Sequence, residues 1–312
     1  MSYKVLVLLK PTEEQPALER VAEFARFLPS LEVVVCRVVS DFSDDQIPTL
    51  KERYEREISS LMKRYPSIEH YETYITFSKN VPEAFCNYAK LKSKTLGMAV
   101  ISANKRNTLR DMFISPLDSQ IMSKINLPLL VVKDAHAPQH LSRAIVLAID
   151  FEENEHDKMV DEVLFAAANS FAEHFNGEVH VLNCVPPIHR GLMSGKTTES
   201  VILGTDKPIT RADVHGRDLA TFAELHGIPA SHCHIAEGRV DEMIPKVCRK
   251  LEARMVCMGM STKDGVLSAI DQSASELVLE QIKGDIFIVN RNINIDDLRA
   301  QQESREAAAA ES

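Results

Sequence analysis

The sequence predicts an α/β protein built from two successive domains, each with a five-stranded parallel sheet and helices on both faces. Its length of 312 residues is typical of about two domains. Short apolar runs alternate with segments of helical periodicity, which is the pattern of a parallel sheet built from βα units. The apolar run 4–10 returns at 144–150, and the run 129–133 returns at 286–290, so the chain reads as a tandem repeat.

The first copy contains five short apolar or β-branched runs, each bounded by breakers or loops, and these favour buried strands. Apolar residues at helical spacing lie between them. Pro11 ends the first strand, and Asn80 is placed to cap a helix. The expected strands are 5–9, 31–39, 71–77, 98–102 and 129–132, and the expected helices are 15–27, 49–64, 81–90 and 118–124, with a loop at 41–48.

The second copy repeats this order of elements. Gly227 follows a helical pattern and is placed to end that helix as a C-terminal cap. The expected strands are 144–149, 178–185, 231–235, 255–258 and 286–289, and the expected helices are 158–174, 213–226, 239–251 and 275–282.

The domain boundaries follow from the repeat. The first domain is expected at 1–136 and the second at 143–292, joined by the short polar linker 133–142. The tail 293–312 is charged and has no apolar face, which is typical of a disordered segment or a frayed helix.

Composition excludes several classes of protein. The formal net charge of −9 is uneven, because residues 1–136 carry +2 and the remainder carries −11, so neither copy is a basic nucleic-acid surface. No apolar run approaches the roughly 18 residues of a transmembrane helix, and no signal-peptide pattern opens the chain, so we expect a cytoplasmic protein without a membrane partner. The six cysteines form no CxxC pair and are expected to be buried and reduced.

Several stretches together resemble the universal stress protein family. In the first copy these are residues 15–18, 115–118 and 131–134, and in the second they are 178–182 and 238–245. The resemblance implies a Rossmann-like fold of the flavodoxin-like, adenine nucleotide alpha-hydrolase-like type, with strand order 3-2-1-4-5. It also implies a cytoplasmic, non-enzymatic role in the stress response, such as resistance to DNA damage.

The resemblance also implies how the copies associate. Single-domain relatives pair between chains, so the tandem is expected to pair internally through the strand edges 129–132 and 286–289. An exposed apolar edge would otherwise be an aggregation hazard. A homodimer, or association with other universal stress proteins, stays open.

The resemblance implies a candidate nucleotide site in the second copy. The family's ATP-binding branch has an Asp after its first strand, and a loop whose three glycines let backbone N–H groups approach phosphate. Here the Asp and the first glycine are present, the other two glycines are replaced, and a serine follows the last of them. ATP or another adenine nucleotide is the implied cofactor, and the candidate residues are Asp150, Cys184, Gly259, Thr262, Gln272 and Ser273.

The first copy departs further from that pattern. Lys10 stands at the Asp position, and the loop 102–107 contains no glycine. Pro116 also removes an N–H donor where the family has Ser or Thr. Lys10, Lys105 and Arg106 could bind another anion or form a solvated basic rim.

Other patterns are less specific. His232 and His234 flank Cys233 on an expected strand, where alternation places both imidazoles on one face. They could share a metal only with further ligands, for which His226 is a candidate, and a half-exposed edge strand explains the pattern more simply. No nucleophile–base–acid set is evident, so an enzyme is not expected. The alternatives are a weak ATPase using Asp150, Gly259 and Ser273, or a carrier or sensor of an apolar ligand under the insertion 188–210.

Overall fold

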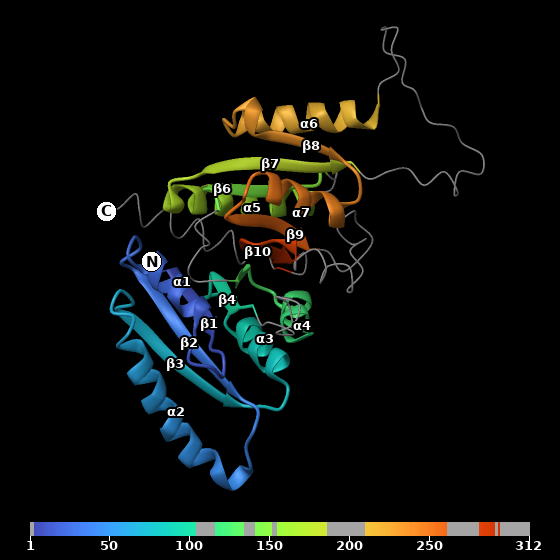
Figure 1. Ribbon diagram of the computed structural model, residues 1–312. Coiled ribbons are helices and arrows are strands. Elements are labelled where there is room, and N and C mark those ends of the chain that lie inside the picture. The colour runs from blue at the N-terminus through green and yellow to red at the C-terminus, as the bar shows by residue number, and fades with distance from the viewer. Residues whose placement is uncertain are drawn as a thin grey trace, which may run out of the picture.

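The computed structural model describes residues 3–103, 116–133, 141–151, 155–185, 210–260, 281–290 and 293. We call 3–133 half one and 141–293 half two. Ten strands form a single sheet in the order β3-β2-β1-β4-β5-β10-β9-β6-β7-β8 (Figure 1). The strands are β1 (Tyr3–Leu8), β2 (Leu31–Val39), β3 (His70–Phe77), β4 (Met98–Ser102), β5 (Leu129–Val132), β6 (Ala144–Ala148), β7 (Glu178–Val185), β8 (Cys233–Glu237), β9 (Met255–Met260) and β10 (Asp285–Asn290).

The strand order confirms the predicted fold class. Numbered within each half, both sets of five strands follow the order 3-2-1-4-5, and every pairing inside a half is parallel. The only antiparallel pairing among the described strands joins β5 to β10, so the two parallel sheets continue into each other.

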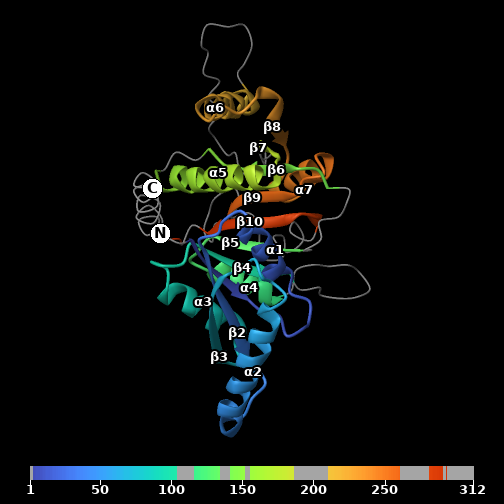
Figure 2. The same cartoon turned by 90° about the vertical axis from the view of Figure 1, so that its left-hand side faces the viewer.

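Helices cover both faces of this sheet. The first face is covered by α1 (Pro16–Ala25), α2 (Ile47–Met62), α5 (Glu155–Phe175) and α6 (Arg211–Leu225), and the second by α3 (Val81–Leu91), α4 (Pro116–Lys124) and α7 (Val240–Lys250) (Figure 2). Side chains alternate along each strand. Val5 and Val7 therefore belong to the core under the first face, while Leu6 and Leu8 belong to the core under the second. Both cores run through both halves.

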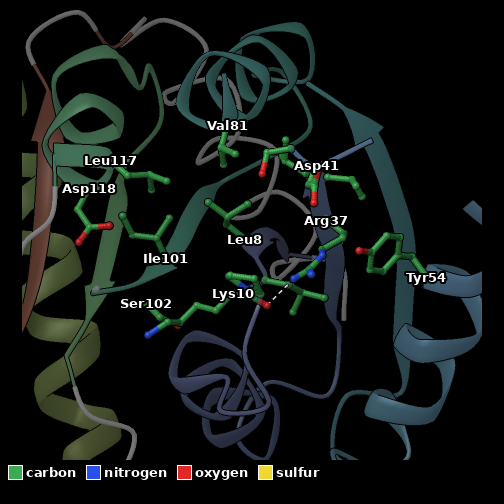
Figure 3. Close-up of a pocket in the computed structure, with 15 residues that line it drawn as sticks. Leu8, Lys10, Arg37, Asp41, Tyr54, Val81, Ile101, Ser102, Leu117 and Asp118 are labelled. Atoms are coloured by element: carbon green, nitrogen blue, oxygen red, sulfur yellow. Dashed lines mark hydrogen bonds between the residues drawn. The ribbon is translucent and has the colours of Figure 1, made fainter. Parts of the chain in front are cut away.

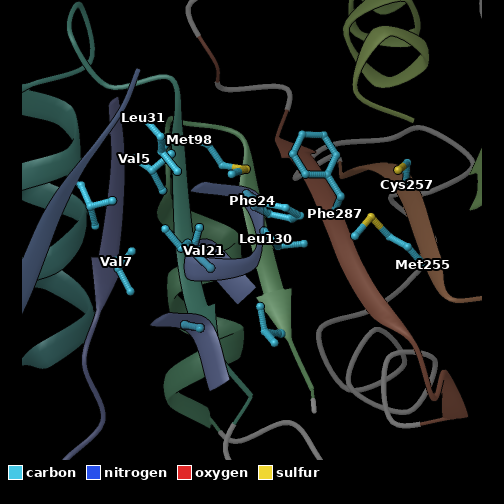
Figure 4. Packing of buried hydrophobic residues seen from close by; sticks show 14 of the residues in the cluster. Val5, Val7, Val21, Phe24, Leu31, Met98, Leu130, Met255, Cys257 and Phe287 are labelled. Carbon is cyan, nitrogen blue, oxygen red and sulfur yellow. The ribbon is translucent and has the colours of Figure 1, made fainter. Parts of the chain in front are cut away.

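The junction between the halves is apolar in the middle and polar at its ends. Leu130 on β5 pairs with Phe287 on β10, and both side chains join the core that also holds Phe24 of α1 (Figure 4). At one end, Arg20 of α1 donates through Nε to Asp285 of β10 at 2.9 Å, and both side chains are almost fully buried. Arg20 also pairs with Glu23 of α1, so Asp285 and Glu23 together compensate its buried charge.

Most of the expected elements are confirmed with boundaries shifted by up to three residues, and two of the shifts have a clear local cause. The expected strand 231–235 begins only at Cys233, because a 3-10 turn, Ala230–His232, follows Pro229 and closes with the His232 N–H donating to the Pro229 carbonyl at 2.8 Å. The helix expected from residue 49 begins at Ile47, after a short 3-10 turn at Asp44–Gln46. Pro48 is tolerated there because the first helical turn needs no N–H donor at that position.

The predicted caps and cysteines are confirmed. The Asn80 side chain accepts from the Glu83 N–H at 3.2 Å, and Gly227 has φ of +66° at the end of α6. All six cysteines are free; five are buried and Cys233 is half-buried. The expected helix 275–282, the linker and the tail lie largely outside the described residues. Within the described part of the chain, the helices include none long and apolar enough to span a membrane.

Candidate functional site

Half one has a cavity of about 280 Å³ at the carboxyl ends of β1, β2 and β4 (Figure 3). This is the edge of an open parallel sheet where ligands bind, beside the point at which the strand order reverses. Its walls are apolar, and four charged side chains also line it. The cavity-lining residues used below are Leu8, Lys10, Arg37, Asp41, Tyr54, Ile101, Ser102 and Asp118.

Arg37 of β2 is the most constrained polar group in this cavity. Its guanidinium donates to the Lys10 carbonyl and lies 5.0 Å above the ring of Tyr54. The buried Arg37 Nε has no hydrogen-bond partner among the described residues. Because a guanidinium carries five N–H donors and cannot be neutralised, Arg37 keeps donor capacity for a bound oxyanion.

Lys10 and its surroundings are held by Gln15, which precedes α1. The Lys10 N–H donates to Gln15 Oε1 at 2.9 Å, and Gln15 Nε2 donates back to the Lys10 carbonyl at 3.0 Å. The Lys10 ammonium reaches the Ala103 carbonyl at 3.5 Å, a long contact that leaves most of its donor capacity for a ligand. The strand end is thus fixed by side chains rather than by a glycine turn.

Ser102 stands in half one at the position of the first glycine of the family's phosphate loop. It occupies the position of Gly259 in half two, as the strand registers show. Its hydroxyl accepts from the Ala17 N–H in the first turn of α1 at 2.9 Å. A side chain that caps α1 therefore stands where the family's first glycine would let a phosphate approach the backbone.

Half two brings three of the predicted residues to the equivalent edge. Asp150 follows β6, Cys184 lies near the end of β7, and Gly259 lies near the end of β9. Burial raises the pKa of the Cys184 thiol to about 12, and the negative charge of nearby Asp150 adds to the shift. The thiol is therefore neutral and unreactive at pH 7, which agrees with a role for its backbone rather than its sulfur.

Packing does not require a glycine at position 259. A Cβ placed there would lie 3.7 Å from Val160 Cγ1 and 3.8 Å from Leu164 Cδ1, which are ordinary contacts. The glycine is consistent with a ligand contact, although Thr262, Gln272 and Ser273 lie outside the described residues. The insertion 188–210 lies there too, apart from Thr210, so the candidate nucleotide site stays a prediction.

Sequence reasoning missed two polar pairs in half two. The buried Asn183 donates to the Ile149 carbonyl at 3.0 Å and contacts His215 Nδ1 at 2.8 Å, which ties the end of β6 to α6. His180 of β7 lies against both His232 and His234. The proposed third ligand, His226, instead lies 3.3 Å from Glu162. The contacts of His180 depend on the register in which β7 and β8 pair in the folded protein, and the sequence alone does not give that register.

The sheet contains two five-stranded units of the same strand order, and known proteins resemble the chain in sequence and in fold. Residues 142–290 match the universal stress protein family. The chain is 24% identical over 308 residues to the universal stress protein E homolog of Haemophilus influenzae, covering 92% of this chain and 97% of the relative. Universal stress protein E of Escherichia coli K12 is 23% identical over 193 residues, covering 60% of this chain and 58% of the relative.

Solved structures give the same fold along the whole chain. A putative universal stress protein from Pseudomonas aeruginosa UCBPP-PA14 superposes with a TM-score of 0.66 at 18% identity, covering 97% of each chain. A universal stress protein from Archaeoglobus fulgidus DSM 4304 gives 0.62 at 15% identity, covering 92% of this chain and 96% of the other. Residues 142–290 thus match the universal stress protein family, and the whole chain resembles universal stress protein E in its tandem-domain form.

Proposed function

We propose that this universal stress protein has a non-enzymatic role in the stress response and acts by binding a small anionic ligand in the half-one cavity. The observation that carries the proposal is the buried Arg37 Nε, which has no acceptor among the described residues beside that cavity. A buried unsatisfied donor of a charged group is costly, and a ligand oxygen would relieve that cost.

The lining also restricts the shape of the ligand. Lys10 and Arg37 lie toward the ends of β1 and β2, where a carboxylate or phosphate would accept hydrogen bonds (Figure 3). Asp118 of α4 lies on another wall and is fully buried. Leu8 and Ile101 supply apolar contact between the two. At about 280 Å³ the cavity takes a metabolite-sized molecule or part of a larger one.

Calorimetric titration of the full chain with phosphate, AMP and ATP tests this proposal. We expect Arg37→Ala to weaken binding of the best of these anions at least about tenfold, since a charged hydrogen bond contributes roughly 1.5–3 kcal/mol. Arg53→Ala is the matched control, because Arg53 also lies over the Tyr54 ring, at 5.7 Å, but does not line the cavity. Equal losses in the two variants, or none, would contradict the assignment to this cavity.

A second candidate function, adenine-nucleotide binding in half two, is favoured by the proximity of Asp150 and Cys184. If ATP binds there, Asp150→Ala should abolish the heat of ATP binding while Lys10→Ala leaves it unchanged. Absence of heat with millimolar ATP in the unaltered protein would contradict both nucleotide binding at this site and a weak ATPase activity. A lipid retained through purification would favour the carrier of an apolar ligand instead.

We further propose that the chain works as an internal pair of domains. β5 and β10 pair with each other at the edges of the two parallel sheets, so the backbone groups of these edges are hydrogen-bonded within one chain. This pairing replaces pairing between chains. Light scattering should then give a mass near 34.9 kDa, that of one chain. A mass near twice that value would show that another surface joins two chains, either as a homodimer or with other universal stress proteins.

A further inference from the structure

Three histidines and a glutamate meet at the outer edge of half two, on β7, β8 and the 3-10 turn that precedes β8. His180 of β7 stacks on His232 with ring centroids 4.3 Å apart, and its Nδ1 lies 3.1 Å from Nε2 of His234. His232 Nε2 lies 3.6 Å from Glu178 Oε2. One ligand atom from each of Glu178, His180 and His232 lies within 4.8 Å of the others.

The corresponding edge of half one has a different chemistry. By the repeat and the strand registers, Val34 occupies the position of His180, and two glutamates lie close by. Lys4 neutralises both glutamates: its ammonium lies 2.7 Å from Glu72 and 3.5 Å from Glu32. The fold therefore requires no histidine at this edge, because ordinary surface ion pairs stabilise the same edge in half one.

Half two lacks that lysine. Ala144 occupies the position of Lys4, so the carboxylate of Glu178 faces His232 instead of an ammonium. Stacking several imidazoles against one another is unfavourable if they are protonated, because like charges would lie within about 5 Å. Neutral imidazoles with a carboxylate beside them are the donor set that Zn²⁺ and related ions prefer.

The contacts give the histidines different roles. Nε2 of His234 lies 3.1 Å from Nδ1 of His180, so Nε2 of His180 is the ring nitrogen left for a metal. Lys250 of α7 contributes a positive charge near His234, which makes His234 the less favourable direct ligand.

We propose that His180, His232 and Glu178 bind a divalent transition metal, best matched by Zn²⁺, and that His234 orients His180 through the contact to its Nδ1. Zn²⁺ takes ligands at about 2.0–2.2 Å in a tetrahedron, so ligand atoms sit roughly 3.4 Å apart. The Glu178 side chain is 68% exposed and can move inward by the remaining distance. Water would complete the tetrahedron. A histidine ligand whose other nitrogen is hydrogen-bonded is the usual arrangement at such sites.

Calorimetry with ZnCl₂ on the tag-free, chelator-treated full chain at pH 7.5 tests the site. We expect one equivalent of Zn²⁺ to bind in the unaltered protein. His180→Val, which installs the residue of half one, and His232→Ala should each weaken binding at least tenfold. His234→Ala should weaken it by roughly 10-fold or more as the loss of an orienting partner.

The matched control is His226→Ala, since His226 also lies beside a glutamate but lacks a second imidazole. It should bind Zn²⁺ like the unaltered protein. Co²⁺ substitution adds a second readout, because visible absorption from tetrahedral Co²⁺ should disappear in His232→Ala, a change in a surface turn that the fold tolerates. No heat at micromolar Zn²⁺, or an affinity unchanged by both His180→Val and His232→Ala, would overturn the proposal.

Discussion

The carboxyl ends of the central strands differ between the two halves, although the strands superpose by register. Half one places Lys10 and Ser102 where half two places Asp150 and Gly259. The Ser102 hydroxyl is bound to the backbone of α1, whereas nothing in the packing around Gly259 excludes a Cβ. The comparison teaches that the scaffold is set by apolar strands, while a few strand-end residues decide which ligand the edge can accept.

Comparing the two halves in this way assumes that they form one folded unit. The buried ion pair of Arg20 with Asp285 at the junction tests that assumption. Asp285→Ala should lower the free energy of unfolding by about 3 kcal/mol, because the buried Arg20 would lose its buried partner and keep only the partly exposed Glu23. Denaturant titration measures this loss. Glu57→Ala, which breaks the exposed pair with Arg53, should cause no measurable change. Similar small effects for both variants would mean that the junction does not stabilise the chain.

Two glycines of half two differ in whether the packing around them leaves room for a side chain. A Cβ on Gly284 would lie 2.2 Å from the Arg254 carbonyl oxygen, so Gly284→Ala should cost about 1–3 kcal/mol. Gly259→Ala should stay within roughly 0.5 kcal/mol of the unaltered protein. Thermal unfolding of the two variants checks the difference. A destabilisation by Gly259→Ala as large as that by Gly284→Ala would remove the argument that Gly259 is kept for a ligand.

The Ser102 hydroxyl should contribute more modestly to half one. Ser102→Ala leaves the buried Ala17 N–H without its acceptor, and we expect a loss of about 1 kcal/mol in chemical denaturation. Ser102→Thr, which keeps a hydroxyl, should retain part of the stability. If Ser102→Ala is neutral, the hydroxyl does not hold α1, and the explanation for the altered strand end fails.

A further expected effect concerns pH and compares His180 with Val34, its counterpart. The pKa of His180 is lowered to about 4 from its ordinary value of 6.5, so the unfolded chain binds a proton first as pH falls. His180 therefore reduces stability progressively from about pH 6.5 down to about pH 4, and no further below. His180→Val should lose less stability between pH 7 and pH 4.5 than the unaltered protein, as measured by urea unfolding at both pH values. An equal loss would contradict the neutral state of this ring.

The fold could be predicted from the sequence because its signals are local. Runs rich in β-branched residues, such as 31–39, favour buried strands, and the repeat assigns their order twice. The pairing of the edges 129–132 and 286–289 followed from the family resemblance, but side-chain contacts between segments distant in sequence could not be predicted. Arg20 and Asp285 are separated by 265 positions, and each looks like an ordinary surface charge in its own segment.

The candidate sites show the same limit. The positions of Asp150 and Gly259 followed from the family pattern, but the cavity beside Arg37 did not, because Arg37 sits in an apolar strand and is recognised only when Tyr54 and Lys10 surround it. The contact of His180 with His232 and His234 depends on strand registry and on the turn after Pro229. Neither feature leaves a motif in the sequence.

Exchanging the strand-end residues tests the central claim that equivalent positions carry different ligand chemistry. Native mass spectrometry of the purified chain, titrated with the anion that binds best in calorimetry, should show one bound anion. We predict that Lys10→Asp abolishes this complex, because the new carboxylate repels the anion beside Arg37, while Asp150→Lys retains it. Retention by Lys10→Asp together with loss in Asp150→Lys would contradict the account and move the anion site to half two.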